Sequence, residues 1–213
     1  MFNPQQFTHK SQEALQQASA LANEHGQPQI EPPHLFLSLL EQTDGVVISI
    51  LQKLDVNIDQ IKQTIMQMIQ MLPKQFGNMP STGMGQIMMG QAMMFLLKQA
   101  HDESKAMGDE YISVEHILLS YLKNKNPISD ILATEKVTHE SVLKVLAEVR
   151  GSQKVDSPSP ESTYQALEKY GLNFTEISDR QIARRVDRLY DKGFVHVIKS
   201  TPYRNIQGQY TKI

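Results

Sequence analysis

The chain contains the same segment twice, about 82 residues apart. Residues 26–40 read GQPQIEPPHLFLSLL, and residues 108–122 read GDEYISVEHILLSYL. The similarity extends to residues 15–26 against 97–108 and to residues 50–56 against 131–137, where the offset falls by one residue. Six residues recur unchanged: Gly26, Ile30, His34, Leu37, Ser38 and Leu40 return as Gly108, Ile112, His116, Leu119, Ser120 and Leu122. A duplication of this length predicts two helical modules that bury their apolar faces together and form a groove between them.

Start and stop signals predict four helices in each module. Thr8 is expected to cap a first helix that ends before Gly26, and Pro32-Pro33 begins a second helix that continues to Leu40. The other expected helices span residues 48–54, 58–71, 91–107, 128–134 and 142–149, with one more from a cap at Ser113 to Leu122. Asn57 is the expected cap of the helix at 58–71, and Thr138 that of the helix at 142–149. Residues 1–150 show no alternation of period two that would suggest a sheet. The expected fold class is all-α, a pseudo-twofold pair of four-helix modules (about 1–75 and 86–149) in a domain of residues 1–149.

Composition removes several kinds of chemistry. The 213 residues include no cysteine, which excludes disulfides and a Cys-based zinc site. The seven histidines do not stand with carboxylates at metal spacing, and His34 and His116 recur at equivalent places, which predicts a role in packing or hydrogen bonding. We find no G-x-S-x-G segment and no nucleophile with a base and an orienting group. We therefore expect no catalytic residue, metal or cofactor, and no enzymatic activity.

The chain also lacks the pattern of an exported or membrane-spanning protein. Its N-terminal residues, MFNPQQFTHK, contain no apolar core of the kind that a signal peptide needs. Nowhere does an apolar stretch approach the roughly 18 residues typical of a transmembrane helix. A cytoplasmic location is the expectation.

Several segments, in order, carry a family resemblance. They are FTHKSQEALQQASALANEHG from residue 7, IEPPHLFLSLLEQ, GDEYISVEHILLSYL, and VDSPSPESTYQALEKYGLNFTE from residue 155. Over residues 1–176 the chain resembles the N-terminal domain of the Clp disaggregase and unfoldase family, specifically the ClpB type. The resemblance implies an all-helical domain that gathers unfolded or aggregated client polypeptide, or docks an adaptor, for an ATP-driven Clp ring. It implies a binding module rather than an enzyme.

The same resemblance implies a set of polar client contacts. The family has a threonine at the start of the first helix and two acidic residues around the second repeat, and these match Thr8, Asp109 and Glu115. From the residues alone, a plain helix cap at Thr8 and a first-turn acid favoured by the helix dipole at Glu115 are equally open.

Full-length members of the family continue into nucleotide-binding modules, which need a glycine-rich loop with lysine and a hydroxyl residue. The nearest spacing here, Gly85 to Gly90, is followed by Gln91-Ala92 and lacks both. We therefore do not expect the chain to bind ATP, and we interpret it as a Clp-type N-terminal domain without the ATPase modules.

Ten of the eleven methionines fall between residues 66 and 107. Core filling is the simpler interpretation, but the segment AMMFLL at 92–97 is apolar around the whole helix, so part of it must contact a partner, a groove or the Met-rich loop. Flexible thioethers adapt to varied apolar sequences. Met88, Met89 and Met93 are therefore predicted to contact client polypeptide.

The last part of the chain differs in charge from the rest. Residues 150–163 form a predicted Ser/Pro linker, and residues 164–213 a predicted helix, a basic helix and a hairpin. The hairpin is expected to have strands at 194–199 and 208–213, joined by a turn around 202–208. Residues 180–213 hold 8 Lys/Arg and only 2 Asp/Glu.

Three interpretations of this tail stay open. A winged-helix-like DNA reader would use Arg184, Arg185 and Arg188 to contact nucleic acid and would make the chain a DNA-binding regulator. Alternatively, the tail is a shortened echo of the segment that begins the family's first nucleotide-binding module. The third possibility is a solvated basic face on a small appendage.

Overall fold

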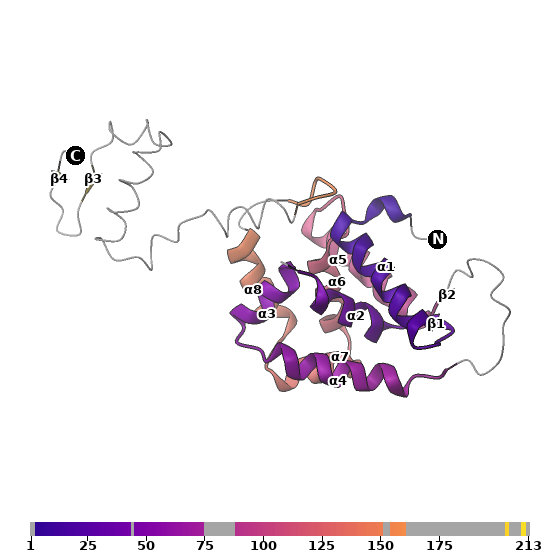
Figure 1. Ribbon diagram of the computed structural model, residues 1–213. Helices are drawn as coiled ribbons and strands as arrows, with labels where there is room; N and C mark the ends of the chain where they lie inside the picture. The colour runs from indigo at the N-terminus through magenta and orange to yellow at the C-terminus, as the bar shows by residue number, and fades with distance from the viewer. Residues whose placement is uncertain are drawn as a thin grey trace, which may run out of the picture. The chain divides into compact units, whose positions relative to one another are not determined.

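Both copies of the repeated unit fold into four helices. The computed structural model describes residues 3–43, 45–74, 88–150, 154–160, 203–204 and 210–211. The chain divides into two units, residues 1–169 and 170–213, and all the described helices belong to the first (Figure 1).

The first module follows the predicted order of helices. It comprises the 3-10 helix η1 (Pro4–Gln6), α1 (His9–Glu24), α2 (Pro32–Glu41), α3 (Val46–Lys53) and α4 (Ile58–Met71). The Thr8 hydroxyl oxygen accepts the backbone N–H of Ser11 and caps α1, and Asn57 caps α4 in the same way. Gly26 reverses the chain after α1 with a φ of +67°, a conformation that glycine adopts without a Cβ clash. The predicted start and stop signals are confirmed here.

The second module repeats this plan. It comprises α5 (Gln91–Met107), α6 (Val114–Lys123), α7 (Pro127–Thr134) and α8 (His139–Arg150). Gly108 ends α5 with a φ of +72°, as Gly26 ends α1. Helix α8 begins three residues before the predicted 142, directly after Thr138, because the cap itself rather than the first apolar residue sets the start.

The second helix of each module forms the centre of the core. Residues 33–40 and 114–121 are all buried, as expected of helices that are apolar on almost every face. Helices α1 and α4 pack on α2, while α5, α7 and α8 pack on α6, and α3 contacts both α2 and α6. A single apolar core therefore runs through both modules.

The two modules also exchange their N-terminal segments. Phe7, just before α1, forms a parallel bridge with Ile112 of the second module. Reciprocally, β2 (Met88–Met89), just before α5, pairs in parallel with β1 (Gln29–Ile30), so that Met89 lies opposite Ile30. In each module, the segment before the first long helix pairs with the segment that precedes the central helix of the other module. This reciprocal pairing confirms the pseudo-twofold relation expected from the repeat.

Two short paired strands occur within residues 1–150, where no alternating pattern had suggested a sheet. Strands β1 and β2 have two residues each, which is too short to produce an alternating pattern in the sequence. Their pairing depends on contact between the modules, which a local pattern does not record.

In the second unit, β3 (Tyr203–Arg204) pairs antiparallel with β4 (Tyr210–Thr211). Strand β4 lies in the predicted strand 208–213, but β3 lies in the segment predicted as a turn, 202–208. Tyrosine favours strands, and proline is tolerated just before a strand, so the Pro202 signal did not exclude one at residue 203. The predicted strand at 194–199 and the predicted helices of the tail lie outside the described residues.

Among the described residues, no single helix is both long and apolar enough to cross a membrane. Helices α2 and α3 satisfy that test only as a pair, and the pair is bent by 84°.

Candidate functional site

A pocket of about 350 Å³ opens where the two modules meet. Its walls come from the start of α2, the end of α4, the first half of α5 and the connection between α6 and α7. Apolar side chains dominate the lining, among them Pro32, Pro33, Leu72, Phe95, Leu96 and Tyr121. We call this cavity the inter-module pocket. Its lining resembles that of sites that bind apolar groups.

Phe95 gives the inter-module pocket an exposed aromatic wall. Its side chain is 57% exposed although it belongs to a helix whose neighbours Leu96 and Leu97 are buried. Met94, beside it, is 48% exposed, and Met88 is 73% exposed. An exposed aromatic side chain next to an apolar cavity is typical of a contact surface rather than of a core position.

Tyr121 lines the same pocket from α6. Its ring packs edge-on against Phe36, with 5.0 Å between the ring centroids, and its hydroxyl donates to the Pro32 carbonyl oxygen at 2.7 Å. Burial raises the pKa of Tyr121 well above its ordinary value, so the phenol keeps its hydrogen and remains a donor. This bond joins the second module's central helix to the start of the first module's.

Glu31 forms part of the pocket wall beside the N-terminus of α5. Burial raises the pKa of Glu31. A Cβ atom at Gly90 would lie 2.2 Å from a Glu31 carboxylate oxygen, so a larger residue here would force the Glu31 side chain to shift, although the φ of −63° does not itself require glycine. The glycine therefore allows the Glu31 side chain to approach α5 closely.

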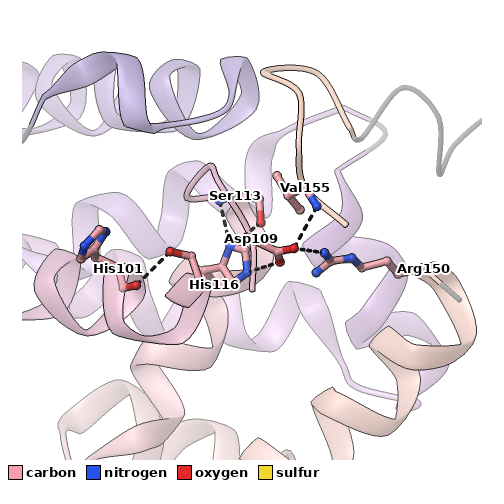
Figure 2. Close-up of polar contacts among 7 residues, drawn as sticks. His101, Asp109, Ser113, His116, Arg150 and Val155 are labelled. Carbon is pink, nitrogen blue, oxygen red and sulfur yellow. Dashed lines mark hydrogen bonds and ion pairs between the residues drawn. The ribbon is translucent and has the colours of Figure 1, made fainter. Parts of the chain in front are cut away.

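In the second module, a cluster of polar groups surrounds the Asp109 carboxylate (Figure 2). Nδ1 of His116 accepts the backbone N–H of Ser113 at 3.0 Å, so Nε2 carries the ring hydrogen and donates to Asp109 Oδ2 at 3.0 Å. The other oxygen, Oδ1, accepts from the Arg150 guanidinium and from the Val155 backbone N–H, the latter at 2.9 Å. The Asp109 carboxylate thereby joins the start of α6, the end of α8 and the segment after it.

The environment of Asp109 favours its charged form. Burial alone would raise the pKa, but hydrogen bonds from His116, Arg150 and the Val155 amide, together with the Arg150 charge, lower it further than burial raises it. The pKa of Asp109 therefore lies well below its ordinary value, and its role in the fold is that of a permanent anion.

The first module has the same arrangement with neutral groups. His34 Nδ1 accepts the Glu31 backbone N–H at 3.0 Å, and His34 Nε2 pairs with the side-chain oxygen of Gln27, the counterpart of Asp109. Gln27 in turn donates to the Ile69 carbonyl oxygen near the end of α4. Burial lowers the pKa of His34. The predicted hydrogen-bonding role of both histidines is confirmed.

The predicted polar contacts are buried in this structure. Thr8 and Glu115 are 0% exposed and Asp109 is 3% exposed. Thr8 acts as a helix cap, and its backbone N–H donates to Ile112 at 3.0 Å. Both carboxylate oxygens of Glu115 are without a hydrogen-bond partner among the described residues, although the residue lies in the favourable first turn of α6. Their contact with a client stays a prediction.

The three predicted methionines lie in different environments. Met88 is exposed and Met89 is half-buried, whereas Met93 is fully buried in the core. Met93 points inward because it lies one helical turn before Leu97, which is also buried, while Phe95 falls on the outer face. Within the AMMFLL segment, the exposed residues are therefore Ala92, Met94 and Phe95.

Arg184, Arg185 and Arg188 lie outside the described residues, and DNA binding stays an untested prediction. Sequence reasoning did not single out Phe95, Tyr121 or the two prolines as pocket residues. The all-round apolar run at 92–97 was the available signal for Phe95, but the cavity itself depends on how α5 packs across the modules.

The comparisons identify relatives of this chain. A family model described as the Clp repeat (R) N-terminal domain matches residues 6–135. The chaperone protein ClpB of Bacillus cereus is 39% identical over 166 residues, or 78% of this chain and 19% of the relative. ClpB 2 of Nostoc sp. is 43% identical over 175 residues, or 82% of this chain and 19% of the relative. The chain thus spans about a fifth of the length of these relatives.

Solved structures share the fold. The Hsp104 N-terminal domain of Candida albicans aligns with a TM-score of 0.61 at 21% identity, covering 73% of this chain and 98% of that domain. A ClpV N-domain in complex with a VipB peptide aligns with a TM-score of 0.55 at 19% identity, covering 68% and 86% respectively. The fold, the duplicated modules and the match to more than half of the residues agree, and this chain belongs to the Clp repeat N-terminal domain family.

Proposed function

We propose that the chain binds exposed apolar segments of unfolded or aggregated proteins in the inter-module pocket. The observation that carries this proposal is the apolar lining of the pocket together with the exposed ring of Phe95 at its wall. Binding is reversible contact, without chemistry on the client. An extended client segment inserts an apolar side chain between α2, α5 and α6.

The size of the pocket sets the strength of such binding. Full burial of one large apolar side chain contributes roughly 1.5–3 kcal/mol, so a single insertion gives a weak and short-lived contact. Weak contact suits a protein that must accept many sequences. Met88 and Met94, both exposed, widen the apolar surface beside the pocket and can adapt to different side chains.

Under this proposal, the polar residues carried over from the family have two roles. Thr8 and Asp109 hold the helices in position: Thr8 caps α1, and Asp109 binds His116 at the start of α6. Glu115 is the buried acid without a described hydrogen-bond partner. We propose that the segment before α1, which pairs with Ile112 through Phe7, moves away and lets a client's backbone N–H or cationic group reach the Glu115 carboxylate. Met93 contributes by supporting α5 from inside the core.

The partners follow from the family. ClpB relatives are named chaperones, and we propose that this chain delivers client polypeptide to a Clp ATPase ring in the cytoplasm, directly or through an adaptor. A relative's N-domain complex with a peptide supports a role in polypeptide binding.

Replacing Phe95 with Ser tests the pocket. The variant should bind a permanently unfolded protein, such as reduced and carboxymethylated lactalbumin, about tenfold more weakly, because about 1.4 kcal/mol of apolar contact is lost. Fluorescence anisotropy with the labelled client measures the change. Because Phe95 is exposed, the stability of the fold should hardly change.

Met71→Ser is the matched control. Met71 is 84% exposed but does not line the pocket, so its loss removes apolar surface without altering the site. Equal weakening by both variants, or none by Phe95→Ser, contradicts the proposal.

A further inference from the structure

Residues 154–160, which we call the strap, return to the helical domain after α8. Its side chains alternate, with Lys154 and Asp156 exposed and Val155 fully buried between them. The Val155 N–H donates to Asp109 at 2.9 Å, and the Val155 carbonyl oxygen accepts the backbone N–H groups of Glu110 at 3.0 Å and Tyr111 at 3.3 Å. Figure 2 shows Val155 above the Asp109 carboxylate.

A second anchor holds the strap to the first module. The Pro158 carbonyl oxygen accepts the His9 backbone N–H at 2.8 Å, and the Ser159 hydroxyl lies 2.8 Å from His9 Nδ1. The strap therefore crosses from the Asp109 cluster of one module to the start of α1 in the other. Apart from the Ser159 hydroxyl, the strap contributes only backbone N–H and carbonyl groups to these hydrogen bonds. An extended polypeptide of another sequence has the same backbone groups.

This arrangement is that of a peptide bound in a slot. Main-chain bonds hold the segment in place, and one branched apolar side chain, that of Val155, is buried, as in strand-addition sites. The receiving groups do not depend on the strap for their positions, because His116 and Arg150 already orient Asp109 and the helix geometry fixes His9. Preorganised groups of this kind favour binding. We call this receiving surface, formed by Asp109, Glu110, Tyr111 and His9, the strap slot.

The strap is held by few contacts. Its buried side chains are Val155 and Pro160, and their apolar contact opposes the conformational entropy lost when seven residues are ordered. Hydrogen bonds to Asp109, Glu110, Tyr111 and His9 supply the rest, so opening the strap breaks these local contacts and leaves the core packed. We propose that the strap is a releasable occupant of the strap slot, and that when it leaves, an extended polypeptide with a Val-like residue binds there. This slot shares no residue with the inter-module pocket.

Competition between the strap and a free copy of itself tests this. The probe is a fluorescent peptide, KVDSPSPE, copied from residues 154–161 and added to the full chain. A tethered strap has an effective concentration of the order of 1 mM, so the wild-type chain should bind the peptide weakly. Val155→Asp puts a charge into the slot beside Asp109, displaces the chain's own strap and should tighten peptide binding at least tenfold.

Two further variants make the outcome specific. A peptide with aspartate in place of the valine, KDDSPSPE, should show no such gain with Val155→Asp, while the Asp156→Ala chain, changed at an exposed position, should bind KVDSPSPE as the wild type does. Val155→Gly is a milder displacement that guards against misfolding of Val155→Asp, and circular dichroism checks both. If neither Val155 variant binds the peptide more tightly than the wild type, the proposal is wrong.

Discussion

The two repeats share a hydrogen-bonded histidine, but its partner side chain is neutral in the first module and charged in the second. In both modules, Nδ1 of a histidine in the first turn of the central helix accepts the backbone N–H of the cap residue. The other ring nitrogen, Nε2, forms a hydrogen bond with the side chain of the residue that follows Gly26 or Gly108. That side chain is Gln27 in the first module and Asp109 in the second. The amide needs only a carbonyl oxygen as its further partner, whereas the buried carboxylate needs Arg150. The charge therefore exists only where a cation is available to balance it.

Asp109→Asn should lower the free energy of unfolding by about 3–5 kcal/mol at pH 7, because it leaves the Arg150 charge without its anion. The folded-state pKa of Asp109 is below its ordinary value of 3.8, so its stabilisation is complete above that value and is lost as the pH falls toward the folded-state pKa. The stability difference between wild type and variant should therefore shrink below about pH 4. Urea unfolding at pH 7 and pH 3 measures it.

Asp102→Asn provides the comparison for this experiment. Asp102 is exposed on α5, close in sequence to the buried site. Its loss should change stability by no more than a few tenths of a kcal/mol at either pH. A stability difference for Asp109→Asn that is the same at both pH values would refute the assignment of the pH dependence to this carboxylate.

The sequence alone anticipated part of this residue-level picture. The recurrence of His34 and His116 at equivalent positions predicted a structural role, because a catalytic group has no reason to appear twice in the same context. Nothing local predicted the Arg150 contact, since its partner is 41 residues away in the sequence. For the same reason, burial of Thr8 and Glu115 could not be inferred from their favourable capping positions.

At the level of elements, the central helices α2 and α6 are joined by one hydrogen bond between the modules. The Tyr121 hydroxyl reaches the carbonyl oxygen of Pro32, a residue 89 positions earlier. Because Pro32 begins α2 at a position that needs no N–H, the helix can start beside this tyrosine without an unsatisfied donor.

Tyr121→Phe should destabilise the fold by about 1–2 kcal/mol, since it leaves the Pro32 carbonyl oxygen without this partner and changes little volume. Thermal unfolding followed by circular dichroism gives the shift. Tyr111→Phe, which alters a partly exposed ring, should have a smaller effect. Equal effects of the two variants would show that the bond between the modules does not contribute.

The bounds of the elements were predictable where a cap or a breaker marks them. Thr8, Asn57 and Gly108 all lie at helix ends in the structure, as their chemistry predicted. The β1–β2 pair and the inter-module pocket were not predictable. They arise from contacts between segments far apart in the sequence, whose positions are set by packing rather than by any local pattern.

For the whole molecule, the shared core predicts that the two modules unfold together. Residues from both belong to one buried cluster, and neither module buries its central helix alone. Native-state hydrogen exchange should give the same opening free energy for the slowest amides of α2 and α6. Their values should also fall together in Tyr121→Phe. Earlier opening of one module in urea would contradict a single cooperative unit.

The reciprocal pairing of Phe7 with Ile112 and of Met89 with Ile30 has a consequence for the origin of the fold. Each half gives its leading segment to the other in the same way, which is the geometry of an isologous homodimer whose subunits exchange arms. Two copies of a single ancestral half could make both contacts before any gene fusion. In such a homodimer the two equivalent positions would have to carry the same residue, whereas one covalent chain can have glutamine at position 27 and aspartate at position 109.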